Sequence, residues 1–457
     1  MFTYASFMAI VFAMGSETAF FHFSKKTGQP AKVLATASHT LIITGLTAVL
    51  ISRLFGFEIM QWIGYPQFPQ FASYFALILA ADAITALGFA WLRQQEKPWS
   101  FAWIRLTNIG VNIGANLFFL VVCPWLGDYL TSPENGCSPK WLDLGVWCLN
   151  QSESANMISN IFISNLLASL ITLPLLWKTW QNLKWGLNVE LLKSMLRYSL
   201  PLVIVGLAGM INETLDRVLL KELLPADLGD AEAGMYSAFY KLSLVLTLFV
   251  QAFRFAAEPF FFGKAGDKDA PETYALVMRY FVYVSGGIYM VTMICIPWLS
   301  PLLLQKPLYY ENARGLSVVP VLLAANLCLG IYYNLSIWYK LSGKTQMGGL
   351  IALFGAIVTI FGNYIFIPQF GFVASAYTTL AAYSTLVILG YWFGQKYYPI
   401  PYQLSIIFLV LLLSVLPITF LPKAFPQFHH AVYWVLVPMY FGVVYTIEKR
   451  LSRAHLS

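Results

Sequence analysis

Long apolar segments recur along the whole chain and are separated by short polar loops. Most have about 20 residues or more, the length of helix needed to cross the hydrocarbon core of a bilayer. The pattern predicts thirteen membrane-spanning helices, at residues 2–21, 32–55, 71–92, 100–122, 156–178, 197–221, 233–261, 274–298, 316–338, 346–367, 372–394, 402–421 and 430–447. A transmembrane β-barrel would instead show alternating segments of about ten residues. The predicted fold is therefore all-α.

Composition supports an integral membrane protein. The chain is 58% hydrophobic and 11% charged, with a mean hydropathy of +0.66, whereas soluble domains carry roughly 25% charged residues. The pI of about 9.0 does not indicate a nucleic-acid partner, because the basic residues lie in short loops between apolar segments. Membrane proteins place Lys and Arg in this way on the cytoplasmic side.

The loop charges also predict an orientation. Lys and Arg gather in alternate loops, which places the C-terminus in the cytoplasm and the longest loop, 123–155, outside. Cys137 and Cys148 lie in that outer loop, where a disulfide is permitted. Cys123 at the membrane edge is a competing partner, so two pairings stay open.

An internal repeat is suggested by "ETAFFHFSKK" at 17–26 and "EPFFFGKAG" at 258–266, which both end a span and start a basic loop. The spans that follow each segment match roughly in position, which predicts two homologous halves. We expect an N-terminal lobe of five spans at 1–178, a cytoplasmic linker at 179–196 and a C-terminal lobe of six spans at 197–398. Two further spans and a basic tail follow at 399–457. The first lobe lacks a counterpart of span 197–221, so we expect either that a fourteenth helix precedes Met1 or that the protein lacks this helix.

Polar residues form a stripe in the fourth span, where Arg105, Asn108, Asn112 and Asn116 share one helical face. Asn160 belongs to a similar series in the fifth span. These side chains are costly in lipid, so they face either a hydrated cavity or a neighbouring helix to which they hydrogen-bond.

The seventh span carries Gln251, Arg254 and Glu258 on one face. Arg254 and Glu258 are spaced to neutralise each other, which is the alternative to a role in binding. Glu17 follows an uncharged segment, and its partner is expected from another helix, with Arg105 or the missing first helix as candidates. Asp82 must pair across helices or be protonated. Intramembrane carboxylates of this kind are candidates for proton or cation coupling.

Catalytic and metal-binding motifs are not evident in the sequence. "SGKTQ" at 342–346 lacks the leading glycine of a P-loop, and the histidines and cysteines show no metal-ligand spacing. No nucleophile and base stand in a recognisable arrangement. We therefore expect neither an enzyme nor a bound cofactor or metal.

Four segments resemble a known family: "GSETAFFHF", "LILAADAITALGFAWLRQQEKPWSFAWIRLTNI", "MLRYSLPLVIVGLAGMINETLDRVLLKELLP" and "QAFRFAAEPFFF". They resemble bacterial polysaccharide-biosynthesis flippases of the O-antigen exporter type, in the multidrug/oligosaccharidyl-lipid/polysaccharide exporter superfamily. The resemblance implies fourteen helices, in two six-helix lobes plus two C-terminal helices, in the bacterial cytoplasmic (inner) membrane. It implies transport of a polyprenyl-pyrophosphate-linked oligosaccharide, such as a lipopolysaccharide O-antigen unit, to the outer leaflet by alternating access, with membrane lipid and polysaccharide polymerase machinery as partners.

The same resemblance suggests roles for the polar residues. Arg105, Arg254 and, more weakly, Arg279 are the candidates for the pyrophosphate. The candidates for the sugar are Asn108, Asn112, Asn116, Asn160 and Gln251. Glu17, Asp82 and Glu258 are the candidates for proton or sodium coupling, or for tuning the arginines. The alternatives are a cation-coupled multidrug exporter of the same superfamily and, less favoured, a membrane glycosyltransferase or ligase with its catalytic residues in an outer loop.

Overall fold

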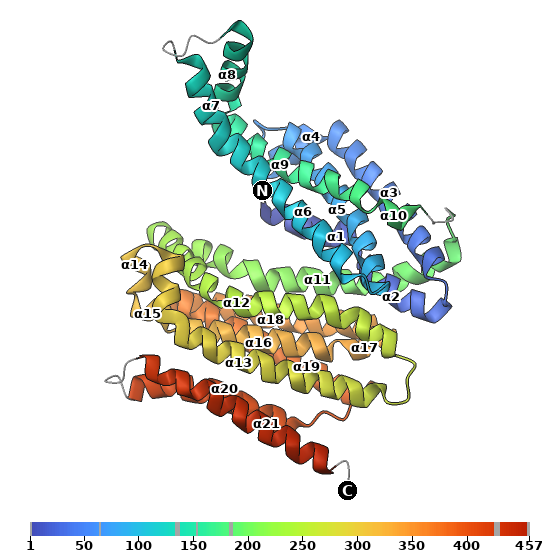
Figure 1. The fold of residues 1–457 in the computed structure, drawn as a ribbon, viewed down its shortest axis with the longest axis vertical. Helices are drawn as coiled ribbons and strands as arrows, with labels where there is room; N and C mark the ends of the chain where they lie inside the picture. The colour runs from blue at the N-terminus through green and yellow to red at the C-terminus, as the bar shows by residue number, and fades with distance from the viewer. Residues whose placement is uncertain are drawn as a thin grey trace. The chain divides into compact units, whose positions relative to one another are not determined.

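The computed structural model describes residues 2–63, 65–132, 138–151, 154–181, 186–424 and 430–454. All regular structure in these ranges is helical (Figure 1). Twelve of the described helical segments are long and apolar enough to cross a membrane. This confirms the predicted all-α membrane fold.

The chain divides into two units, Met1–Leu200 and Pro201–Ser457, and the division falls inside one long helix at a proline. The elements of the first unit, up to that shared helix, are α1 (Phe2–Ala13), α2 (Ser16–Thr27), α3 (Pro30–Leu54), α4 (Gly56–Ile63), α5 (Gln70–Gln94), α6 (Pro98–Leu117), the π-helical turn η1 (Phe118–Val122), α7 (Cys123–Thr131), α8 (Pro139–Gln151), α9 (Ser154–Leu175), α10 (Trp177–Trp180) and α11 (Val189–Leu223).

The second unit contains the rest of α11 and the helices that follow it. They are α12 (Ala226–Lys264), α13 (Ala270–Leu304), α14 (Pro307–Tyr310), α15 (Ala313–Leu316), α16 (Val319–Leu335), α17 (Ile337–Leu341), α18 (Thr345–Phe370), α19 (Phe372–Tyr397), α20 (Leu404–Ala424), the 3₁₀ turn η3 (His430–Val435) and α21 (Leu436–Ala454). Both α20 and α21 pack on α13 (Figure 1).

The first predicted span, 2–21, is not continuous. Met14 and Gly15 have φ values of 47° and 60°, so two successive residues leave the right-handed helical region and separate α1 from α2. Glycine adopts this conformation without steric cost. Hydropathy alone does not distinguish Gly15 from the other small residues of the apolar segment. The break places Glu17 in the first turn of α2, although the apolar segment Ser6–Thr27, one of the twelve, runs across it.

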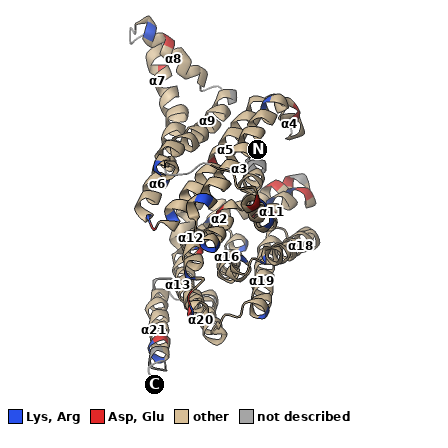
Figure 2. Cartoon of the chain, turned by 90° about the vertical axis from the view of Figure 1, so that its right-hand side faces the viewer, with Lys and Arg blue, Asp and Glu red and all other residues tan. Residues whose placement is uncertain are grey.

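The last predicted span, 430–447, is divided between η3 and α21. It is not among the twelve apolar segments, since α21 carries Glu448, Lys449 and Arg450. Elsewhere in the described chain, charged side chains are sparse along the helices (Figure 2).

Large aromatic side chains fill the interior of each unit, Phe71 and Phe162 in the first and Tyr236 and Phe239 in the second. Small residues let helices approach closely, as where Gly45 of α3 meets Ala80 of α5. Membrane helices associate largely through such packing, because lipid supplies no hydrophobic drive between them.

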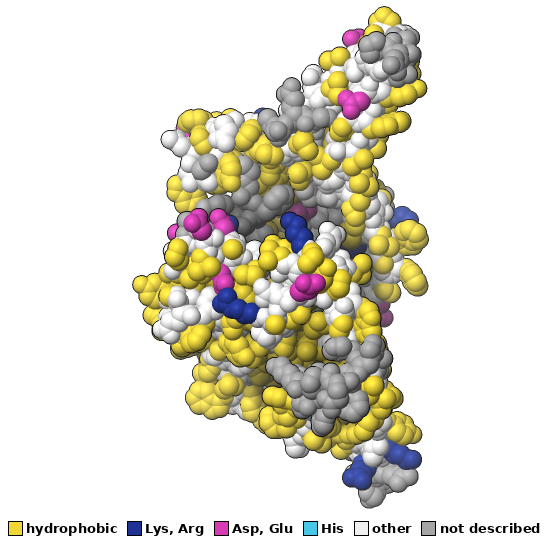
Figure 3. Space-filling view, turned by 90° about the vertical axis from the view of Figure 1, so that its left-hand side faces the viewer, with side chains coloured by type: hydrophobic (Ala, Val, Ile, Leu, Met, Phe, Trp, Pro, Cys, Tyr) yellow, Lys and Arg dark blue, Asp and Glu magenta, His cyan; other side chains and the backbone are white. Residues whose placement is uncertain are grey.

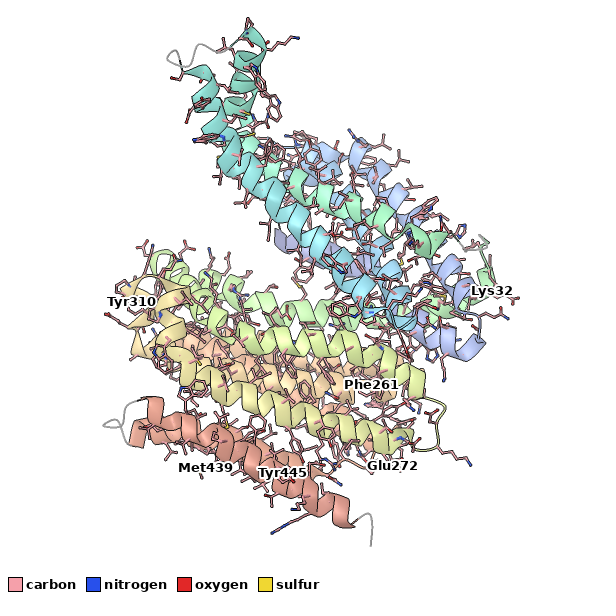
Figure 4. All side chains as sticks on the ribbon, in the orientation of Figure 1. Lys32, Phe261, Glu272, Tyr310, Met439 and Tyr445 are labelled. Carbon is pink, nitrogen blue, oxygen red and sulfur yellow. The ribbon has the colours of Figure 1, made fainter. Side chains whose placement is uncertain are left out.

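The outer faces of the helices are apolar, and hydrophobic side chains cover most of the face in Figure 3. On α21, Met439 and Tyr445 are labelled in Figure 4 and are 61% and 67% exposed. Such surfaces are suited to lipid.

Candidate functional site

A recess in the second unit collects the charged residues of the seventh span. Its volume is about 270 Å³, including the part open to solvent, and α12, α16 and α17 form its walls. Its lining contains the polar side chains of Arg254, Glu258, Ser336 and Lys340 and the aromatic side chains of Phe253, Phe261 and Tyr333. Phe261 is labelled in Figure 4 near the C-terminal end of α12.

Glu258 forms an ion pair with Lys340 of α17, at an Oε1–Nζ distance of 3.2 Å. Both side chains are largely buried, 7% and 12% exposed. Glu258 thus has a basic partner on another helix, whereas the sequence suggested only Arg254, one turn earlier on its own helix. Lys340 was missed as a site residue because it was counted among the basic residues of a cytoplasmic loop.

Arg254 lies over the ring of Tyr333, with 4.8 Å between the guanidinium carbon and the ring centroid. This cation–π contact uses the face of the guanidinium, and an anion binds through the N–H groups at its edge. Gln251 is half-buried on α12, one turn before Arg254. The recess therefore brings together one of the predicted substrate-binding residues, Arg254, and one of the predicted carboxylates, Glu258, while Gln251 is not among its lining residues.

A buried polar network lies elsewhere in the second unit, around Asp216 of α11. Its carboxylate is 1% exposed and accepts hydrogen bonds from Tyr236 at 2.8 Å, Asn363 at 2.7 Å and Thr379 at 3.0 Å. These donors come from α12, α18 and α19, so the network ties four helices together. The sequence analysis did not select Asp216.

Asp216 lies among other charged residues of α11. Glu213, Arg217 and Lys221 recur every four residues and suggest a self-neutralised helix end. In the structure, Lys221 pairs with Asp230 at 2.6 Å, and the Arg217 guanidinium lies 4.9 Å from the Tyr240 ring centroid. The available signal was a further acidic residue, Asp216, beside these charges within the predicted span 197–221.

In the first unit, Glu17 pairs with Arg93 at the end of α5, with 2.6 Å between Oε1 and Nη2. Arg93 is 8% exposed and also lies over the Phe21 ring. The sequence predicted Arg105 or a helix before Met1 as the partner, and for Arg105 the prediction of a direct contact is wrong, because Arg93 holds this carboxylate. Arg93 was overlooked because it was assigned to the loop after the third span.

Arg105 lies over the ring of Phe89, at 4.3 Å, and close enough to Glu17 and Asp82 for their charges to act on it. Asp82 accepts a hydrogen bond from Ser169 of α9, at 2.6 Å. The structure thus brings three predicted residues into one charged cluster and gives Asp82 a partner across helices.

The asparagine stripe of α6 faces α9. Asn108 donates to the Ala168 carbonyl oxygen at 2.8 Å and to Thr172 at 3.0 Å, and Asn112 donates to Asn165 at 2.6 Å. Hydrogen bonding between helices, one of the two alternatives left open by the sequence, is thus observed for both.

Asn116 and Asn160 make local contacts. Asn116 donates to the Asn112 carbonyl oxygen one turn earlier on α6, at 2.8 Å. Asn160 is buried on α9 and donates to the Gln151 carbonyl oxygen at the end of α8, at 3.1 Å.

Arg279 is held by residues outside the recess. Its Nε lies 2.8 Å from Oε1 of Glu448 on α21, and its Nη1 donates to Gln403 just before α20. This pair joins α13 to the C-terminal helices and is not one of the groups lining the recess.

Of the cysteines in the outer loop, Cys137 lies outside the described residues, so its predicted pairing with Cys148 is not tested. Cys148 is buried on α8, and its thiol lies close enough to that of Cys123 on α7 for the two to interact. Within the described residues, no group of three or more His, Cys, Asp or Glu side chains is placed to hold a metal ion.

The chain is similar to one protein family in sequence and to solved transporter structures in fold. The family of polysaccharide biosynthesis proteins matches residues 148–262, a segment that includes Gln251, Arg254 and Glu258. Curated protein sequences contain no match to this chain.

Among solved structures, the chain is similar to a variant of the MATE transporter VcmN from Vibrio cholerae. The TM-score is 0.60 at 14% identity, over 86% of this chain and 87% of that one. The bent form of VcmN gives a TM-score of 0.60 at 14% identity, over 90% and 87% of the two chains. The lipid II flippase MurJ, in an inward closed conformation, gives 0.45 at 13% identity, over 98% and 92%.

At this level of identity the VcmN comparison establishes the fold. Over residues 148–262 the family match confirms the resemblance to polysaccharide-biosynthesis proteins that the sequence predicts.

Proposed function

Since this all-helical membrane protein has the fold of a MATE transporter and matches the polysaccharide biosynthesis family, we propose that it is a flippase for lipid-linked oligosaccharide. Its substrate in this proposal is an oligosaccharide on a polyprenyl pyrophosphate, such as an O-antigen unit. The protein moves the head group from the inner to the outer leaflet of the bacterial cytoplasmic membrane by alternating access. The C-terminus is on the cytoplasmic side.

The observation that carries this proposal is that two basic side chains, Arg254 and Lys340, line one recess of the second unit. A pyrophosphate cannot enter hydrocarbon without compensation of its charge. A guanidinium binds phosphate oxygens through two parallel N–H groups, and a lysine adds a point charge. The two basic residues provide a site for the pyrophosphate of the substrate. The ring of Tyr333 packs against the face of the Arg254 guanidinium.

Glu258 fits this site as an exchangeable counter-ion. While the recess is empty, its carboxylate pairs with Lys340 and keeps a largely buried ammonium group from being uncompensated. An incoming phosphate takes over that interaction, and release restores the original pair. The exchange allows binding to be selective for anions without being irreversible.

For the sugar, Gln251 is the favoured contact among the predicted residues. It lies one turn from Arg254, whereas Asn108 and Asn112 already hold α6 against α9. Within the first unit, Arg105, with Glu17 and Asp82 nearby, is proposed as a phosphate-binding residue.

Transport in this proposal is coupled to a proton or a sodium ion. The ion binds at carboxylates that accept hydrogen bonds from neutral donors. Asp82 accepts from Ser169, and Asp216 accepts from tyrosine, threonine and asparagine side chains. A buried carboxylate in such surroundings gains or loses a proton or a cation more readily than one that is held by arginine.

These same acidic residues favour the second candidate, a multidrug exporter that takes cationic substrates. The test is a leaflet assay in cells depleted of the protein, with rescue by the wild type, by Arg254→Ala and by the control Arg53→Ala, whose side chain is exposed at the end of α3. We expect lipid-linked oligosaccharide to accumulate on the cytoplasmic side and only Arg254→Ala to fail in rescue. Normal lipid-linked sugars together with raised sensitivity to cationic drugs would replace the flippase with the drug exporter.

A further inference from the structure

The first unit contains a helical hairpin that the transport proposal does not use. Helices α7 and α8 run side by side and project beyond α4 and α9 (Figures 1 and 2). The continuous helical segment Pro98–Thr131, which ends in α7, has 34 residues. At 1.5 Å per residue it is about 51 Å long, well over the ~30 Å of a hydrocarbon core.

The position of Cys123 in this segment follows from the same arithmetic. If α6 starts at the inner membrane surface, after Lys97, Cys123 lies about 37 Å further along the axis, beyond the hydrocarbon. The orientation predicted from the loop charges makes that end the outer one. Both helices of the hairpin then face an oxidising compartment, in which disulfides form and persist.

Glycines bring the two backbones of the hairpin close together. A Cβ at Gly127 of α7 would lie 3.1 Å from the Gly145 carbonyl oxygen, and a Cβ at Gly145 of α8 would lie 3.4 Å from the Gly127 carbonyl oxygen. In an antiparallel pair that crosses at these glycines, the residue four before Gly127 faces the residues three or four after Gly145. Those positions are Cys123 and Cys148.

The contacts agree with that register. Cys123 and Cys148 are both 0% exposed, and the two thiols lie close enough to interact with each other. A disulfide requires the two Cα atoms to be within about 7 Å, which side-by-side helices reach only where small residues line the contact. Gly127 and Gly145 meet that requirement one turn away.

We propose that Cys123 and Cys148 form a disulfide that fastens α7 to α8 outside the membrane. In the structure both are thiols. In the reaction each thiol loses its hydrogen, the two sulfurs join, and a thiol–disulfide oxidant of the outer compartment takes up two electrons and two protons to become a dithiol. The bond closes the segment 123–148 into a loop and limits separation of the two helices.

The experiment counts thiols in the full-length protein from native membranes. The membranes are dissolved in denaturant that contains N-ethylmaleimide, so that buried free thiols are blocked as well, and the protein is then reduced and labelled with a maleimide–polyethylene glycol. The chain has five cysteines, Cys123, Cys137, Cys148, Cys295 and Cys328. We expect two labels per chain in the wild type, none in Cys123→Ser or Cys148→Ser, and still two in the matched control Cys137→Ser.

Peptide mapping of the unreduced wild type gives a second readout that does not depend on how well a variant folds. It should yield one cross-linked species that contains Cys123 and Cys148. A cross-link that includes Cys137, or a wild-type protein whose five cysteines are all blocked before reduction, overturns the proposal.

Discussion

Glu17 and Arg93 form an ion pair between α2 and α5, with 2.6 Å between Oε1 and Nη2. The second unit contains the corresponding pair, in which Glu258 of α12 contacts Lys340 of α17. Glu17 and Glu258 are the two residues that the internal repeat aligns, and each meets a basic residue roughly 80 positions later. Each unit therefore contains an ion pair at this position. Without it, the carboxylate near the end of the span would be left without a basic partner.

Breaking the pair in the first unit should destabilise it. We expect Glu17→Ala to lower the free energy of unfolding by about 1–3 kcal/mol, less than the loss of a fully buried pair, because the Glu17 side chain is 29% exposed. Thermal unfolding in detergent, followed by tryptophan fluorescence, measures this loss.

The reversed pair, Glu17→Arg with Arg93→Glu, is the control for that measurement. It should recover part of the stability lost in each single variant. If the double variant is as unstable as the sum of the single variants, the pair contributes no coupling energy.

A turn in the second unit depends on the absence of a side chain. Gly371, between α18 and α19, has φ +58°, and a Cβ there would lie 2.0 Å from Oε2 of Glu232. Glu232 also binds Arg314 at 2.7 Å and the backbone N–H of Phe372 at 2.7 Å. We expect Gly371→Ala to disrupt both contacts and to lower the free energy of unfolding by about 2 kcal/mol or more.

The matched control for this variant is Gly209→Ala. Gly209 lies inside α11, and a Cβ added there meets no atom within 4 Å. This control should be neutral or stabilise the protein by up to about 1 kcal/mol, as alanine does in a helix. Equal stabilities of the two variants would contradict the strain assigned to the turn.

Replacement of Asp216 tests the buried network. In Asp216→Asn one acceptor oxygen becomes an amide donor, which no longer accepts from Asn363 or from the two hydroxyl donors. We expect a loss of about 1–3 kcal/mol in the free energy of unfolding, since a buried donor loses its acceptor. The exposed pair of Asp230 with Lys221 supplies a control, and Asp230→Asn should cost at most about 1 kcal/mol.

The asparagine stripe should act on helix packing. Asn112→Ala removes the hydrogen bond from α6 to Asn165 of α9. It should cost between about 0.6 kcal/mol, the average measured for hydrogen bonds between membrane helices, and about 1.7 kcal/mol, the maximum. Transport by the variant, corrected for the amount of folded protein, should be unchanged. Reduced transport with wild-type thermal stability would instead indicate that Asn112 contacts the sugar.

The length and apolarity of the segments were enough to predict the all-α membrane fold, because these two properties define a membrane-spanning helix. Most predicted limits lie within a few residues of the helix ends, as for 372–394 against Phe372–Tyr397. The break at Met14 and Gly15 was missed because backbone conformation at a glycine depends on the packing around it, which hydropathy does not report.

Candidate site residues were harder to predict than spans. A charge stripe reveals which residues share a face, as with Gln251, Arg254 and Glu258, but it does not reveal what the face contacts. Arg93 and Lys340 were assigned to loops by position, although their long side chains reach back along the helices to Glu17 and Glu258. Asp216 was missed because its partners are neutral residues from three other helices.

The central claim is that Arg254 binds the pyrophosphate of a lipid-linked oligosaccharide. The most direct measurement is flipping of a fluorescent polyprenyl-pyrophosphate sugar in proteoliposomes, comparing wild type, Arg254→Ala, Arg254→Lys and the control Arg53→Ala. Loss of a charged hydrogen bond of about 1.5–3 kcal/mol predicts a rate at least about tenfold lower for Arg254→Ala, with an intermediate rate for Arg254→Lys. Wild-type rates for Arg254→Ala in folded protein would contradict the assignment of the phosphate site.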